Sequence, residues 1–256
     1  MTEPFNIDQA TITMKLKQLF YPLVLSASFT ANADTLSLTV GGGAWNESPS
    51  GNFQKIGDPA AVDVNNQLFW DDESQTYLFA TFEHPVPIIP NVKLMKTTLD
   101  QSGSGTANFV FDGNTYTGNV NNDFSMETLD LYAYYEILDN VVSLDLGLDI
   151  RNIKIDYTIT STGVTTTDSI DETVPMIYAM VGATPWPDLT ISGEISYISY
   201  DGSEISDFTA KVSYTTSFLV GVEAGYRNQQ YTLDDVSDTN ADLSFDGVFA
   251  GAYLKL

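Results

Sequence analysis

The chain has 256 residues and a formal net charge of −24, from 34 acidic residues against 10 Lys and Arg. This balance argues against a nucleic-acid partner, because phosphate binding requires basic surfaces. Cysteine is absent and His84 is the one histidine, so disulfide frameworks, thiolate metal sites and multi-histidine zinc sites are excluded as well.

The first 33 residues have the order of a secretory leader. Two lysines precede an apolar run at 19–29, and small residues follow it at 31–33. That order is typical of a cleaved signal peptide, and the run is shorter than the roughly 20 residues of a membrane-spanning helix. We predict that residues 1–33 are upstream residues and a signal peptide, and that residues 34–256 form one exported domain.

Beyond residue 34 the apolar residues recur at every second position. Residues 142–151 place Val, Leu and Ile on one face and Ser, Gly, Asp and Arg on the other, and residues 128–137, 207–214 and 218–227 behave alike. A period of two predicts long strands with one apolar face. Over residues 152–159 the apolar positions continue one register later, which predicts a bulge or an extension beyond a membrane.

Short and long connections alternate between these strands. Turn-forming residues make the short ones, at 84–91, 138–140, 184–188 and 215–216. The long ones are polar, and we expect solvated loops at about 45–74, 101–123, 161–170, 201–205 and 234–240. The remaining segments give ten strands, at about 34–44, 75–83, 92–100, 124–137, 141–160, 171–183, 189–200, 206–214, 217–233 and 241–256. Ambiguous faces in 75–83 and 171–183 leave eight or twelve strands open.

Two all-β architectures accommodate this pattern. A soluble sandwich would pack the apolar faces inward, whereas a transmembrane antiparallel up-and-down β-barrel would turn them toward lipid. Aromatic residues near strand ends, such as Phe82, Trp186 and Phe218, favour the barrel, and so does a final strand that reaches residue 256. Outer-membrane barrels also combine short periplasmic turns with longer extracellular loops. We therefore predict a barrel of about ten strands.

The last residues and two inner segments carry a family resemblance. Gly251, Leu254 and Leu256 resemble the C-terminal assembly signal of Gram-negative outer-membrane proteins, with Leu where Phe is usual. Residues 41–46, with three glycines, and the proline-rich residues 82–91 are similar to proteobacterial outer-membrane β-barrel proteins with an N-terminal glycine-glycine motif. The resemblance covers nearly the whole exported part. It implies an outer-membrane location and recognition by the outer-membrane assembly machinery, but no activity.

Charged residues on the polar faces are the candidate lumen lining. They are Asp145, Asp149, Arg151, Glu194, Asp207, Lys211, Glu223 and Arg227. Acids outnumber bases, so a water-filled path would prefer cations. About ten strands leave an interior little wider than its side chains fill. The sequence leaves open both a lumen plugged by ion pairs and a narrow cation-leaning passage.

No catalytic or metal site is predicted. We expect His84 to be a structural residue of its turn, because this turn lies on the predicted periplasmic side, whereas outer-membrane proteases and hydrolases place their groups at the outer rim or on the lipid-facing surface. Asp238, Asn240 and Asp242 have the spacing of a calcium loop, but Leu243 stands where glycine is needed. We expect a monomer without cofactors that is not an enzyme and that contacts outer-membrane lipid and lipopolysaccharide. Its role would be that of a scaffold or small-solute channel, with adhesin-like binding through the acidic loops as the alternative.

Overall fold

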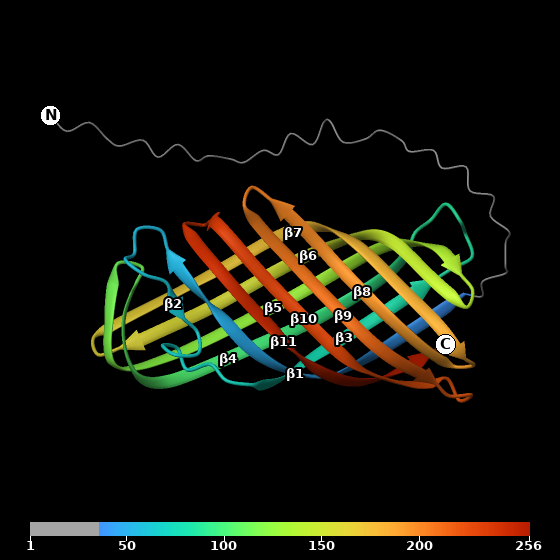
Figure 1. Ribbon diagram of the computed structural model, residues 1–256, viewed down its shortest axis with the longest axis horizontal. Coiled ribbons are helices and arrows are strands. Elements are labelled where there is room, and N and C mark those ends of the chain that lie inside the picture. The colour runs from blue at the N-terminus through green and yellow to red at the C-terminus, as the bar shows by residue number, and fades with distance from the viewer. Residues whose placement is uncertain (1–35) are drawn as a thin grey trace. The chain divides into compact units, whose positions relative to one another are not determined.

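The computed structural model describes residues 36–256, which form one closed antiparallel sheet (Figure 1). β1 pairs with β3, each strand from β3 to β10 pairs with the one that follows it, and β11 pairs with β1 to close the ring. The strands are β1 (Ser37–Lys55), β2 (Val62–Asp63), β3 (Glu73–Glu83), β4 (Asn91–Phe111), β5 (Asn114–Asp139), β6 (Val142–Ser161), β7 (Val164–Trp186), β8 (Leu189–Tyr200), β9 (Ser203–Thr215), β10 (Val220–Val236) and β11 (Thr239–Lys255).

The ring has the predicted up-and-down order, and a sandwich is excluded. All strands except β2 belong to it, which confirms the expected ten; β2 pairs only with Asn52 and Phe53 of β1. Within the described residues no helix has the length and apolar character needed to cross a membrane. The signal-peptide prediction and the domain boundary at 33/34 fall outside the described residues.

The short turns are located where they were predicted. They join β3 to β4, β5 to β6, β7 to β8 and β9 to β10. Residues 36 and 256 lie at this same end, where the Leu38 amide donates a hydrogen bond to the Leu256 carbonyl at 3.0 Å. We call it the short-turn end; in outer-membrane barrels this end faces the periplasm.

The long polar connections were mostly predicted wrongly as loops, because they are strand. β4 and β5 stay paired from Asn91↔Tyr134 to Phe111↔Asn114, and β6 and β7 are joined through residues 162–163. Asp112 and Gly113 have φ of 53° and 68°, the left-handed values of the tight turns that match the strand twist. The polar side chains of β4 and β5 near this turn face outward to solvent. The sequence of these strands therefore has the composition of a loop.

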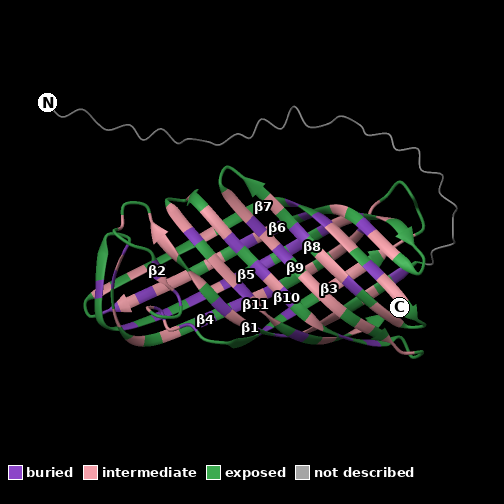
Figure 2. Cartoon of the chain, viewed as in Figure 1, coloured by how far each residue is buried: buried purple, intermediate pink, exposed green. Residues whose placement is uncertain are grey.

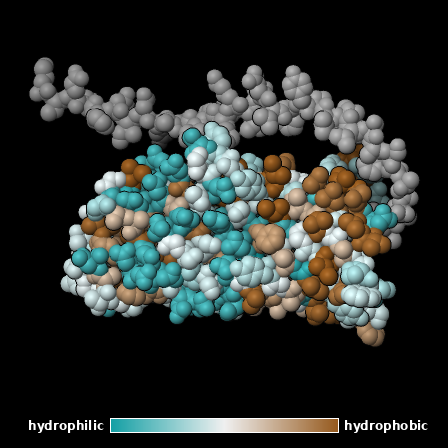
Figure 3. Space-filling model, viewed as in Figure 1, coloured by the Kyte–Doolittle hydropathy of each residue, from teal (hydrophilic) through white to brown (hydrophobic). Residues whose placement is uncertain are grey.

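The apolar side chains change sides along each strand. In β6, Leu146 and Leu148 are exposed on the outer surface, whereas Ile153 and Ile159 are buried inside. The pairing of β6 with β7 has no irregularity, so the shifted pattern marks an extension and not a bulge. Buried and exposed residues alternate throughout (Figure 2), and most of the apolar surface gathers near the short-turn end (Figure 3).

This apolar belt has the composition of a surface that faces lipid. It includes Leu38, Val40, Leu78, Leu94, Leu129, Leu131, Leu146, Leu148, Ile150, Ile177, Val181, Ile191, Ile195, Phe208, Val212, Val220, Val222, Val248 and Leu254, all exposed. Exposed aromatic residues such as Trp186, Tyr197 and Tyr226 lie along its edges. The belt covers the part of every ring strand next to the short turns. The other part, which we call the outer half, is polar outside and apolar inside.

Glycines near the β1–β11 seam make room for aromatic side chains in the lumen. A Cβ on Gly43 would lie 2.2 Å from the Ala250 carbonyl oxygen and 2.7 Å from the Tyr77 hydroxyl. A Cβ on Gly251 would lie 2.3 Å from the same hydroxyl. The Tyr77 ring can therefore lie against the backbone of the seam.

Candidate functional site: the lumen

Two arginines and two aspartates occupy the middle of the lumen. Arg151 on β6 forms ion pairs through Nε with Asp130 on β5 and through its terminal nitrogen with Asp207 on β9, and its side chain is fully buried. Arg227 on β10 donates from Nε and from a terminal nitrogen to the two oxygens of Asp207, at 3.0 and 2.7 Å. The four charges sum to zero, so these ion pairs, which we call the ion-pair plug, are internally neutral.

Neutral side chains attach the ion-pair plug to further strands. Thr97 on β4 accepts a hydrogen bond from Arg227 at 2.9 Å, and Gln229 donates to Asp207 at 2.8 Å. The guanidinium of Arg227 also lies over the Trp45 ring of β1, 5.1 Å from its centroid. The plug therefore connects β1, β4, β5, β6, β9 and β10 across the interior.

An apolar core fills the outer half of the barrel beyond the ion-pair plug. It contains Trp45, Val62, Val64, Leu68, Trp70, Leu99, Phe109, Phe111, Tyr116, Val120, Phe124, Met126, Ile153, Ile159 and Phe245. The Tyr116 hydroxyl donates to Thr166 at 2.5 Å, and burial raises the pKa of this phenol, so it stays neutral. The lumen is thus apolar where the outside is polar.

Part of this core comes from the connection between β1 and β3, which was expected to be a solvated loop. Val62, Val64, Leu68 and Trp70 are buried in it. Asn122 on β5 anchors the segment, because its amide donates to the Leu68 carbonyl and its oxygen accepts from the Trp70 indole, both at 2.7 Å. Side chains from residues 62–70 therefore fold into the barrel, and we call residues 56–72, which include them, the inserted segment.

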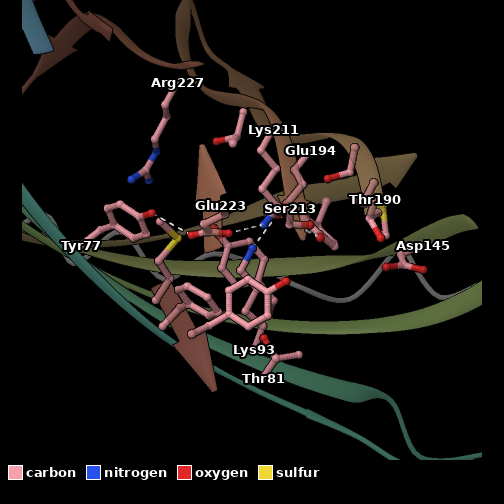
Figure 4. A pocket seen from close by; sticks show the side chains of 18 of the residues that line it. Tyr77, Thr81, Lys93, Asp145, Thr190, Glu194, Lys211, Ser213, Glu223 and Arg227 are labelled. Carbon is pink, nitrogen blue, oxygen red and sulfur yellow. Dashed lines mark hydrogen bonds and ion pairs between the residues drawn. The ribbon is translucent and has the colours of Figure 1, made fainter. Parts of the chain in front are cut away.

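On the other side of the ion-pair plug a cavity of about 260 Å³ extends toward the short-turn end. Its lining reaches Glu83, Thr215 and Lys255 at that end, and Figure 4 shows other side chains of the lining, among them Lys93, Glu194 and Lys211. Two salt bridges cross it, from Lys93 to Glu194 and from Lys211 to Glu194 at 2.8 Å. We call it the inner cavity.

Aromatic and acidic groups complete this set of contacts. Tyr77 donates to Glu223 at 2.7 Å, and Lys211 lies 3.4 Å from the other oxygen of Glu223. The ammonium of Lys93 lies 4.7 Å from the centroid of the Tyr132 ring. Both lysines are thus paired with carboxylates, and Lys93 has an aromatic neighbour as well.

Two of the candidate lumen residues lack such partners. Both oxygens of Asp149 are buried without a hydrogen bond. Asp145 lines the inner cavity and is 5% exposed. Among the described residues neither carboxylate forms an ion pair, which separates them from Glu194, Asp207 and Glu223.

All eight candidate lumen residues have side chains inside the ring, in two groups. Arg151, Asp207 and Arg227 belong to the ion-pair plug, and Glu194, Lys211, Glu223 and Asp145 line the inner cavity. Asp149 is buried beside the plug, where the charges of Asp130, Arg151 and Asp207 act on it. Sequence reasoning left out Lys93, Thr97 and Gln229. The alternation of Lys93, Met95 and Thr97 with Val92 and Leu94 was the available signal for β4.

The residues of the proposed assembly signal and the single histidine lie at or near the short-turn end. Gly251 faces the lumen beside Tyr77, whereas Leu254 and Leu256 are exposed. The backbone amide of His84 donates to Asn91 at 2.9 Å, and its Nδ1 accepts from the Val86 amide at 3.2 Å. These contacts give His84 a structural place in its turn.

No protein-family model matches the chain, and no curated protein does. Solved structures that it resembles are outer-membrane barrels. The protease OmpT from Escherichia coli matches at 11% identity and a TM-score of 0.47, over 90% of this chain and 99% of OmpT. OprG from Pseudomonas aeruginosa matches at 12% and 0.41, over 88% and 98%. Ail, the attachment invasion locus protein of Yersinia pestis, matches at 11% and 0.38, over 87% and 100%.

Because these TM-scores lie below 0.5, the class of the protein is assigned from the closed ring of strands and the apolar belt of this chain. A closed antiparallel ring leaves no unpaired edge, and an apolar belt around a polar interior suits a bilayer. The chain is a transmembrane β-barrel of the outer-membrane type.

Proposed function

We propose that this protein is a closed outer-membrane scaffold and not a conduit for solutes. The observation that carries the proposal is the ion-pair plug, in which Asp130, Arg151, Asp207 and Arg227 are 0 to 6% exposed and bonded to one another across the lumen. The alternative of a narrow cation-leaning passage requires water at this level. It also requires a path through the apolar core beyond it.

The cost of opening the ion-pair plug supports this choice. Separating a buried ion pair leaves charges without partners, which costs about 3–5 kcal/mol. An open state with that cost would be populated in fewer than about one molecule in a hundred. The inserted segment closes the lumen a second time, because its buried side chains would have to leave the core.

The exported chain would act as a monomer whose belt contacts lipid on every ring strand. We propose no reaction for it, since its one imidazole is held in a turn at the short-turn end. Recognition by the assembly machinery through Gly251, Leu254 and Leu256 belongs to the same proposal, and so do the cleaved leader and the contact with lipopolysaccharide. The proposal that the lumen is closed does not depend on the leader, the assembly machinery or lipopolysaccharide.

Conductance in planar bilayers tests the closed lumen. The refolded chain should insert without discrete current steps. A variant that lacks residues 58–70 and carries Arg151→Ala and Arg227→Ala should conduct, provided that its heat-modifiable gel shift shows a folded barrel. Lys96→Ala, on the outer surface, serves as a control that should not conduct. Regular single-channel steps from the unaltered chain would overturn the proposal.

The polar outer half favours one second candidate, binding at the cell surface. A groove of about 590 Å³ is lined there by Glu73, Asp100, Asp123 and Asp156. Together with the net charge of −24, these acids suit a basic partner. Cells that display the triple variant Asp100→Asn, Asp123→Asn, Asp156→Asn should bind polylysine-coated beads less well than cells with the unaltered chain. Equal binding would count against this role.

A further inference from the structure

Asp145 is a buried carboxylate without a partner at the wall of the inner cavity. It is 5% exposed, and the described residues around it act on it through their charges, with no hydrogen bond or ion pair to it. Figure 4 shows it apart from the bonded lysines and glutamates. A buried charge without a partner costs free energy, so this position is suited to a group that is supplied from outside the chain.

The charged neighbours of Asp145 do not relieve this cost. Glu136 is its cross-strand partner on β5, and the other charges that act on it come from Glu83, Glu194 and Asp139. All are acids, and like charges on opposite residues of a sheet repel. The nearby bases are engaged elsewhere, since Lys93 and Lys211 pair with Glu194 and Glu223. The electrostatics around Asp145 therefore favour a cation.

The lining of the inner cavity favours an organic cation over a metal ion. Met180 is the cross-strand partner of Asp145 on β7, and Met95, Phe79, Tyr134 and Tyr178 share the lining. Thioethers and aromatic rings contact apolar groups and ammonium groups well. Among the described residues no set of three acids or imidazoles is placed to hold a metal ion. A cavity of about 260 Å³ also exceeds the needs of a bare ion.

We propose that the inner cavity binds a small organic ammonium compound that enters from the short-turn end. Its ammonium group forms a charge-assisted hydrogen bond with Asp145. Its apolar body packs against Met95, Met180 and the tyrosine rings. The site is independent of the closed lumen, because the ion-pair plug separates it from the outer half.

Calorimetry with the refolded chain in detergent micelles tests the site, with 2-phenylethylammonium chloride as the probe. We expect saturable binding with one site per chain. Asp145→Asn should weaken binding about tenfold or more, because it removes the charge and keeps the shape. Asp123→Asn, on the outer surface, should bind as the unaltered chain does, and a heat-modifiable gel shift should show that both variants fold.

The uncharged analogue 2-phenylethanol distinguishes binding at the site from partition of the probe into micelles. It should bind at least about tenfold more weakly than the amine. Equal affinity of the alcohol, or of Asp145→Asn for the amine, would overturn the proposal. Displacement of the amine by an equimolar amount of Mg²⁺ would also overturn it, because a divalent-ion site would then be present.

A labelling experiment checks the place of binding, because the chain has no cysteine of its own. Met180→Cys should react faster with a cationic than with an anionic methanethiosulfonate reagent, and the amine should slow the reaction. Adding Asp145→Asn should remove the preference for the cation. Equal rates for the two reagents with Asp145 intact would contradict the proposed charge of the site.

Discussion

Single residues in the lumen differ in what they contribute, and their burial decides the difference. Arg151 lies between Asp130 and Asp207, and its side chain is 0% exposed to solvent. Lys96 and Glu127 form a similar pair at 3.0 Å on the outer surface, where both side chains are 48% exposed. Buried pairs are costly to break, whereas exposed pairs contribute little.

Arg151→Ala should therefore lower the free energy of unfolding by about 3–5 kcal/mol, because Asp130 loses its cation while Asp207 keeps Arg227. Lys96→Ala should cost less than about 1 kcal/mol. Unfolding with guanidinium chloride in lipid vesicles, followed by tryptophan fluorescence, measures the loss of stability in both variants. Similar losses in the two variants would contradict the placement of Arg151.

The glycines make a second contrast among single residues. Gly43→Ala should destabilise the barrel by about 1–3 kcal/mol, because the added Cβ meets backbone atoms of β11 that cannot yield. Gly193→Ala is the matched control, since its Cβ would meet only the Thr209 carbonyl oxygen, at 4.0 Å. The same titrations compare them. A tolerated Gly43→Ala would show that the seam is looser than described.

Among the elements, β6 shows what alternation in the sequence could predict and what it could not. The period of two at 142–151 predicted the strand and the side of each residue correctly. The apolar shift at 152–159 was compatible with a bulge or an extension, and only the continuous pairing with β7 decides for the extension. Alternation reports which face is apolar, but not whether that face meets lipid or a core.

The inserted segment could not be predicted for a different reason. Residues 56–72 have the polar and turn-forming composition of a loop, and the four apolar residues that enter the core are too few for a periodic signal. The Asn122 side chain anchors them from a strand more than fifty residues later in the sequence. Contacts of this range come from the closed ring and not from local sequence.

Trp70→Ala should cost about 3–5 kcal/mol, because the indole leaves a cavity in the apolar core and its hydrogen bond to Asn122 is lost. Protease added to intact cells should also cut residues 56–72 faster in this variant than in the unaltered chain. Equal cutting of both chains would mean that the segment is outside the barrel.

The molecule as a whole combines two arrangements in one ring. Near the short-turn end it has apolar residues outside and polar residues inside, as lipid requires. In the outer half the order is reversed, as in a soluble barrel. Folding therefore needs a bilayer or micelle for one half and water for the other, and the chain should show a heat-modifiable gel shift only after refolding with detergent or lipid.

Cysteine scanning along β6 with spin labels tests this division most directly, because the chain has no native cysteine. Labels at 144, 146, 148 and 150 should collide with oxygen dissolved in lipid, and labels at 154 and 156 with a water-soluble nickel reagent, while 153 and 159 should be protected from both. Lipid contact at 154 and 156, or its absence at 146 and 148, would contradict the account.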